Sequence, residues 1–182
     1  MSLSDEEILK RFREEGGQNY AFNLLVRKYG QKLYWVVRRL VIDHDDTDDL
    51  MQNVWVKVWQ NLESFKAESQ LYTWLYRISA NEALTFLNKK KKKFFLSLVD
   101  VEAELSEKVE ADPGISGDEI QLKLQKAILS LPEKQRLVFQ MRYYDEMPYE
   151  EMSQVLGTSV GALKASYHHA AKKIEAYITT ES

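Results

Sequence analysis

The sequence DDLMQNVWVKVWQNL, from Asp48 to Leu62, decides how the first part of the chain folds. Its apolar residues recur at intervals of three and four, which on an α-helix gathers them into one stripe: Met51, Val54, Trp55, Val58, Trp59 and Leu62. Thr47 is the predicted N-cap of this helix, and Asp48 and Asp49 would lie in its first turn, where the helix dipole favours carboxylates. The opposite face is rich in amides. It is either the solvated side of a core helix or a docking surface, and it carries Asp49, Gln52, Asn53, Lys57 and Gln60.

The composition of the 182-residue chain favours an all-α protein, because it has only seven Gly and three Pro and few alternating β-branched runs. The absence of Cys excludes disulfides and thiolate metal sites. The first residues, MSLSDEEILKRF, lack the apolar core of a signal peptide, and no apolar run approaches the roughly 20 residues of a membrane helix. We therefore expect a cytoplasmic protein without membrane insertion.

Charge divides the chain into three parts. The net charge is −3, but residues 94–118 hold seven acidic residues against one basic residue, whereas residues 1–93 hold 16 basic against 13 acidic. The stretch SEKVEADPGISGD also contains Pro113, Gly114 and Gly117 and shows no apolar stripe. We therefore expect two small helical domains, over 1–93 and 118–182, joined by an acidic flexible linker over 94–117.

The acidic cluster DHDDTDD, Asp43 to Asp49, has two interpretations. Clustered carboxylates bind Ca²⁺ or Mg²⁺, and a metal-dependent nuclease would use them in that way. An EF-hand loop that began at Asp43 would require Gly at its sixth position and Glu at its twelfth, where this chain has Asp48 and Val54. The better interpretation is a turn leading into a helix N-terminus, with a basic partner.

The segment LYTWLYRISANEALTFLNKKKKK, from Leu71 to Lys93, predicts a helix with a basic end. Residues 76–93 contain six basic residues and one acidic residue. Cations interleaved with aromatic side chains suit phosphate contact and base stacking. A solvated helix C-terminus, which the helix dipole also favours, explains the Lys run equally well.

The C-terminal part predicts a helix-turn-helix. A short helix from Tyr149 to Leu156 is followed by Gly157, which can adopt positive φ, and then by a long helix capped by Thr158 or Ser159. A plain helical hairpin is the alternative interpretation.

Three blocks in this order resemble the extracytoplasmic-function group of the sigma-70 family of bacterial RNA polymerase sigma factors. DDLMQNVWVKVW resembles the helix that binds core polymerase. SFKAESQLYTWLYRISANEALTFLNKKKKK resembles the block that reads the −10 element, and LPEKQRLVFQMRYYDEMPYEEMSQVLGTSVGALKASYHHAAKKI resembles the −35-reading domain. The resemblance implies a transcription initiation factor with no catalytic site and no cofactor. Its implied partners are core RNA polymerase, double-stranded promoter DNA, the melted non-template strand and an anti-sigma factor.

The resemblance also implies roles for individual residues. Core polymerase would contact Asp49, Leu50, Gln52, Asn53 and Trp55. The loop from Phe65 to Leu71, with Asn81 below it, would form the pocket for an unstacked base. The full −10 set is Phe65, Lys66, Ser69, Arg77, Asn81, Lys89, Lys90 and Lys91, and the −35 set is Ser159, Lys164, Ser166, His168, His169 and Lys172.

The predicted recognition helix departs from the family pattern. Two expected cations are replaced in the run His168-His169-Ala170-Ala171, so the −35 contact is expected to be weaker or to read another sequence. The paired His do not predict a metal site, because no acidic or Cys residue lies at ligand spacing. A helix-turn-helix regulator that works without polymerase is the rival function, but it leaves DDLMQNVWVKVW unexplained.

Overall fold

The computed structural model describes residues 3–94, 98–112 and 118–180, and all regular secondary structure in these ranges is helical. The all-α prediction is confirmed. The helices are α1 (Asp5–Arg13), α2 (Gln18–Val41), α3 (His44–Asn61), α4 (Leu71–Phe94), α5 (Leu98–Glu110), α6 (Glu119–Leu129), α7 (Glu133–Tyr143), α8 (Tyr149–Leu156) and α9 (Val160–Thr180). None of the helices in the described ranges is long and apolar enough to cross a membrane.

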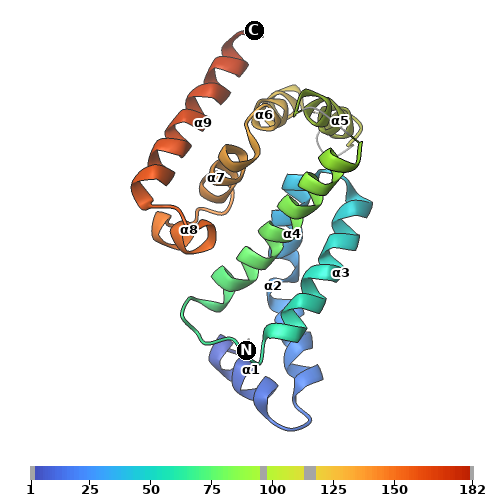
Figure 1. Ribbon diagram of the computed structural model, residues 1–182, viewed down its shortest axis with the longest axis vertical. Helices are drawn as coiled ribbons and strands as arrows, with labels where there is room; N and C mark the ends of the chain where they lie inside the picture. The colour runs from blue at the N-terminus through green and yellow to red at the C-terminus, as the bar shows by residue number, and fades with distance from the viewer. Residues whose placement is uncertain (1–2, 95–97, 113–117, 181–182) are drawn as a thin grey trace.

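Helices α2, α3 and α4 lie side by side, and α1 packs across one end of them (Figure 1). The predicted stripe of α3 faces inward, since Met51, Val54, Val58 and Leu62 are all buried. Trp59 is 39% exposed and closes the edge of the bundle, where its ring meets Phe12 and Phe22 edge-on at centroid distances of 5.4 and 5.1 Å. The apolar spacing of α3 therefore positions its amide-rich face outward.

The start of α3 differs from the prediction. The helix begins at His44, and its N-cap is Asp43, whose carboxylate accepts a hydrogen bond from the Asp46 N–H at 3.0 Å. Thr47 is completely buried in the first turns and donates its hydroxyl to the Asp43 carbonyl at 2.6 Å. Lys108 lies 3.2 Å from the Asp43 carboxylate. The acidic cluster is thus a helix N-terminus with a basic partner, as the second interpretation held, but Thr47 is not its cap.

The predicted flexible linker is wrong over Leu98–Glu110, which forms α5. Leu105 and Val109, one helical turn apart, are buried against Ile42 and Leu129. Two apolar residues do not make a recognisable apolar stripe in a sequence, but they are enough to hold the helix against a partner surface. Residues 95–97 and 113–117 of the expected linker lie outside the described residues.

The helix-turn-helix is formed by α8 and α9, with the predicted bounds of α8. Gly157 adopts the left-handed conformation, with φ of 64°, and its N–H donates to the Ser153 carbonyl at 2.9 Å. Ser159 caps α9 by accepting a hydrogen bond from the Ala162 N–H at 3.3 Å. Of the two predicted N-caps of α9, Thr158 and Ser159, it is therefore Ser159 that caps the helix.

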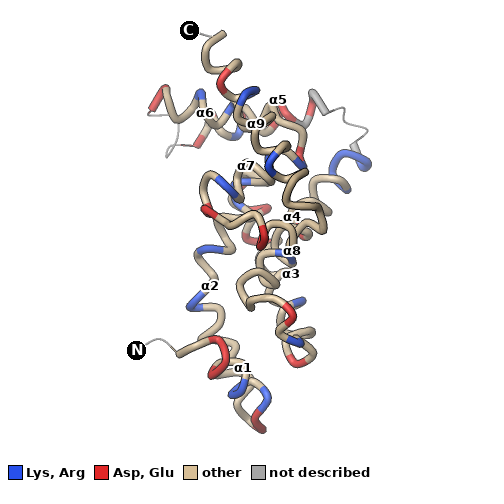
Figure 2. The backbone as a smooth tube through the Cα atoms, turned by 90° about the vertical axis from the view of Figure 1, so that its left-hand side faces the viewer, with Lys and Arg blue, Asp and Glu red and all other residues tan. Residues whose placement is uncertain are grey.

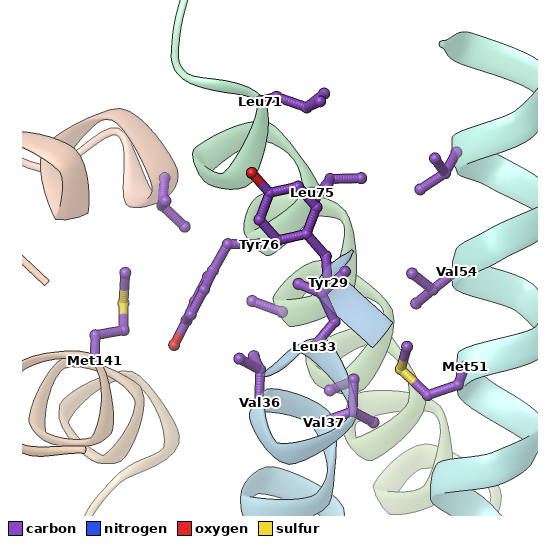
Figure 3. Close-up of a cluster of buried hydrophobic side chains, with 14 of the residues drawn as sticks. Tyr29, Leu33, Val36, Val37, Met51, Val54, Leu71, Leu75, Tyr76 and Met141 are labelled. Atoms are coloured by element: carbon purple, nitrogen blue, oxygen red, sulfur yellow. The ribbon is translucent and has the colours of Figure 1, made fainter. Parts of the chain in front are cut away.

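A single apolar cluster connects the first four helices to the C-terminal part. It contains Leu33 and Leu75 from the bundle together with Met141 and Met152 from α7 and α8. In Figure 3 the ring of Tyr76 extends from α4 toward Met141. The two helical parts consequently pack against each other as one body.

Candidate polymerase and nucleic-acid interface

The amide-rich face of α3 is open to solvent. Asp49, Gln52 and Asn53 are exposed on it, whereas Trp55 is half-buried with its ring edge-on to Phe22 at 5.8 Å. Leu50 is only 6% exposed, and its side chain belongs to the bundle core. Three of the five predicted polymerase contacts thus form one polar surface, while Leu50 supports the helix from inside.

The loop between α3 and α4 forms a cavity of about 540 Å³. Phe65, whose ring lies 5.1 Å from that of Trp74, provides an aromatic wall, and Ile78 adds an apolar contact. The remaining lining residues are polar or charged: Lys57, Asn61, Ser64, Lys66, Glu68, Ser69, Arg77 and Gln154. Such a site can stack a flat base, bond to its edge and hold a nearby phosphate.

Four residues of the predicted −10 set, Phe65, Lys66, Ser69 and Arg77, meet at this cavity. Sequence reasoning missed Asn61 and Ser64, which lie at the end of the preceding helix and just beyond it. It also missed Gln154, and no local signal could have found it, because that residue comes from α8.

Arg77 is already engaged within the chain. Its guanidinium Nη2 donates to the carbonyl oxygen of Gln154 at 2.6 Å, and its Nε is buried without a hydrogen-bond partner among the described residues. Arg77, which was predicted to bind a DNA phosphate, therefore binds the backbone of α8 in this structure.

Asn81, which was predicted to lie below the loop, does not line the loop cavity. It lies one helical turn beyond Arg77 and lines a second cavity, of about 330 Å³, between α4 and the C-terminal helices. The other lining residues are Leu84, Lys134, Leu137, Val138, Val155, Leu156, Thr158, Leu163 and Ser166.

The basic end of α4 is partly neutralised by neighbouring carboxylates. Lys90 lies 2.5 Å from Glu104 of α5, and Lys91 lies 2.5 Å from Glu133 of α7. Figure 2 shows basic residues gathered at the end of α4 and acidic residues along α5. Lys89 remains exposed.

The predicted −35 residues occupy α9 and its cap. Lys164, His168, His169 and Lys172 are exposed, and Lys164 lies over the ring of Tyr149 at 5.7 Å. Ser166 is half-buried and faces the second cavity. Within the described ranges, no group of three or more His, Asp or Glu side chains is arranged to hold a metal ion.

Two family models match the chain. The model described as Sigma-70 region 2 matches residues 25–93, and the model described as Sigma-70, region 4 matches residues 121–174. The first match includes α3 and the loop that follows it, and the second includes the helix-turn-helix.

Curated relatives extend this similarity over nearly the whole chain. The chain is 33% identical to the ECF RNA polymerase sigma-E factor of Escherichia coli (strain K12), over 95% of this chain and 93% of the relative. It is 30% identical to the RNA polymerase sigma-H factor of Pseudomonas aeruginosa, over 94% and 92%.

Two solved structures share the fold. CnrH, solved in complex with the cytosolic domain of CnrY, has a TM-score of 0.69 at 24% identity, with coverage of 98% of this chain and 99% of that one. The sigma factor RpoE, solved with the anti-sigma factor NepR from Bartonella quintana, has a TM-score of 0.68 at 20% identity, over 88% and 98%.

Proposed function

The chain belongs to the extracytoplasmic-function group of the sigma-70 family of RNA polymerase sigma factors, and we propose how its surfaces divide the work of initiation. The family is one of transcription initiation factors, in which the polymerase performs the chemistry. As a member, the chain binds core polymerase and directs it to specific promoters. We assign polymerase and −10 binding to residues 1–93, −35 binding to residues 118–182, and the site of action to the cytoplasm.

The observation that carries the −10 proposal is the loop cavity. Its aromatic wall of Phe65 and Trp74 can stack an unstacked non-template base, while Lys66 and Arg77 at its edge can contact the adjoining phosphates. Asn81 is exposed one helical turn beyond Arg77 and does not line this cavity.

The −35 proposal rests on the exposed side of α9. Lys164, His168 and Lys172 follow one another at intervals of four and so share a face that can enter the major groove. An anti-sigma protein is a proposed further partner, because the similar sigma factor RpoE was solved in complex with the anti-sigma factor NepR.

Reconstituted transcription tests the function as a whole. The protein is mixed with sigma-free core polymerase and genomic fragments, and transcript starts are sequenced. Starts that share paired −10 and −35 elements are expected. Failure to bind core polymerase would instead favour a stand-alone DNA-binding regulator.

A cavity-filling variant tests base capture. Ser69→Phe places a ring where the base would enter, so promoter melting should be lost while polymerase binding is retained. The matched control is Gln70→Phe at the exposed neighbouring position, which does not line the cavity. Melting is read from the permanganate reactivity of unpaired thymines. Normal melting by Ser69→Phe would contradict the assignment.

A further inference from the structure

The backbone between α2 and α3 is strained at Ile42. This residue has φ of 65° and ψ of −35°, and across it the Asp43 N–H donates to the Val41 carbonyl at 2.7 Å. A hydrogen bond between residues two apart, around a residue with positive φ, is the pattern of a classic γ-turn, which is rare and unfavourable. A β-branched residue such as Ile is especially disfavoured at positive φ. Contacts from the rest of the molecule must therefore hold this turn in place.

The side chain of Ile42 is held by helices from a later part of the chain. It is 6% exposed and forms an apolar cluster with Leu105 and Val109 of α5 and Leu129 of α6, separate from the cluster that fills the helical bundle. Figure 1 shows α5 beyond the end of the bundle at which α2 ends and α3 begins. The positive φ thus directs the Ile42 side chain away from the bundle and into contact with α5.

Ion pairs with the α5 segment lie on both sides of the turn. On the α2 side, the Arg38 guanidinium donates to the carboxylate of Asp112, just beyond the end of α5, at 2.8 Å. On the α3 side, the Lys108 ammonium lies 3.2 Å from the Asp43 carboxylate and 3.8 Å from that of Asp46. Docking of α5 therefore both covers the turn and pairs the charged side chains beside it.

The turn in its strained form sets the start of α3, the helix with the proposed polymerase-binding face. The Asp43 carboxylate accepts a hydrogen bond from the Asp46 N–H, and the Asp43 carbonyl accepts from both the N–H and the hydroxyl of Thr47. If Ile42 returned to negative φ, the Asp43 carboxylate and carbonyl would leave these positions. The first turn of α3 would then lose its cap, just before the polymerase-binding face begins at Asp49.

We propose that α5 is a positioning element for polymerase binding, because its contact with Ile42 holds the strained turn that fixes the N-terminus of α3. This inference rests on the polymerase-binding face proposed above. Without α5, Ile42 would expose an apolar side chain while its backbone stayed in an unfavourable conformation. The turn would then relax and the first turn of α3 would open.

Cα chemical shifts measured by NMR on the full chain test this coupling, because they report the helical population of each residue. The first-turn shifts are those of Asp46 and Thr47, and the shift of Val58 reports on the rest of α3. Val109→Asp places a charge in the buried contact and should undock α5. The matched control Ala103→Asp adds the same charge on the exposed side of α5.

In Val109→Asp the first-turn shifts should move toward random-coil values, whereas Ala103→Asp should leave them unchanged. The Val58 shift should stay helical in both variants. Leu105→Ala is a milder undocking variant that adds no charge, and it should move the first-turn shifts in the same direction by less. If Val109→Asp also loses the helical shift of Val58, Leu105→Ala decides the question. Helical first-turn shifts in both undocking variants would overturn the proposal.

Ile42→Gly separates the strained turn from ordinary packing. Glycine adopts positive φ without steric cost, so the first turn should stay helical in Ile42→Gly and should remain helical when Val109→Asp is added. If α5 acted by packing alone, Val109→Asp would have the same effect with and without Ile42→Gly. Loss of the first turn in Ile42→Gly by itself would also contradict the strain explanation.

Binding to immobilised core polymerase connects the turn to the proposed function. Val109→Asp should weaken binding about tenfold, because only chains with an intact first turn are competent, and adding Ile42→Gly should restore most of that loss. Normal binding by a Val109→Asp chain whose first turn has opened would refute the positioning role.

Asp49→Lys tests the polymerase-binding face itself and should abolish binding to core polymerase. If Asp49→Lys binds normally, the proposed face is wrong, while the chemical shifts still decide whether α5 holds the turn. If Asp49→Lys fails to bind but the first-turn shifts do not respond to undocking of α5, the face stands and the positioning role fails.

Discussion

Two completely buried threonines, Thr47 and Thr73, are expected to contribute to stability with opposite signs. The Thr47 hydroxyl donates to the Asp43 carbonyl at 2.6 Å, but the Thr73 hydroxyl has no hydrogen-bond partner among the described residues. An unpaired buried hydroxyl costs desolvation free energy that a methyl group of the same size does not.

We expect Thr73→Val to raise the free energy of unfolding by about 1 kcal/mol and Thr47→Val to lower it by about as much. Urea unfolding of the two variants at neutral pH measures both values. The matched pair keeps side-chain shape and burial constant, so a loss of stability in Thr73→Val would show that its hydroxyl has a partner.

Single residues were also where sequence reasoning failed. Asp43 and Thr47 are both good N-caps, and the choice is decided by tertiary contacts: Thr47 is buried and Lys108 lies beside Asp43. Leu50 was predicted by resemblance to contact core polymerase, and its side chain belongs to the core. The cap of α3 and the burial of Leu50 both depend on residues that are distant in the sequence, which local patterns do not reveal.

At the scale of elements, α5 is held by ionic contacts that depend on pH. Hydrogen bonding from the Asp46 N–H, and then Lys108, lowers the pKa of Asp43. A hydrogen bond from Lys90, aided by Lys108, lowers the pKa of Glu104. Because both pKa values are lowered in the folded state, this stabilisation is present above the ordinary carboxyl pKa and is lost as pH falls through the lowered values.

Lys108→Ala should therefore lower the melting temperature at pH 7 by about 3 °C, corresponding to about 1 kcal/mol for these partly exposed groups. The difference from the unmodified protein should shrink as the pH falls below the ordinary carboxyl pKa values and Asp43 and Glu104 become protonated. Lys172→Ala, at an exposed position of α9, is the control. If the melting temperature of Lys108→Ala stays equally low in acid, the Lys108 side chain stabilises the protein through packing and not through its charge.

The turn of the helix-turn-helix gives a second prediction for an element. Gly157→Ala should destabilise the protein by about 1 kcal/mol, because φ is +64° there although no atom obstructs a new Cβ. Gly161→Ala, which also meets no atom within 4 Å and lies in α9, should be neutral or stabilising. Thermal unfolding compares the two, and equal effects would refute the backbone explanation.

Elements with strong local signals were predictable, and those without were not. The bounds of α8 followed from its apolar spacing and Gly157, and the start of α9 followed from the cap at Ser159. Helix α5 was missed because it has only two buried residues in its described part, Leu105 and Val109, within an acidic stretch.

At the scale of the whole molecule, the shared apolar cluster couples the two helical parts. All four Trp residues lie within residues 1–93, so their fluorescence reports on the first part, while far-UV circular dichroism reports on all helices. We expect coincident denaturation midpoints from the two signals. Two separate midpoints would show that the parts unfold independently.

This packing could not be predicted from the sequence. The apolar positions of Tyr76 and Met141 fit helix stripes within their own domains equally well, and helical spacing does not specify which distant helix a stripe meets. The cavity residues Phe65, Lys66 and Ser69 could be predicted, since they lie within one short loop.

The contact between Tyr76 and the Met141 region also gives the molecule a response to temperature. Opening would transfer buried apolar surface to water and so increase the heat capacity. Because apolar association weakens on cooling and chain entropy grows on heating, the contact between the two helical parts should be most populated at an intermediate temperature. The contact between the two helical parts should therefore loosen at both extremes of temperature, below as well as above the optimum.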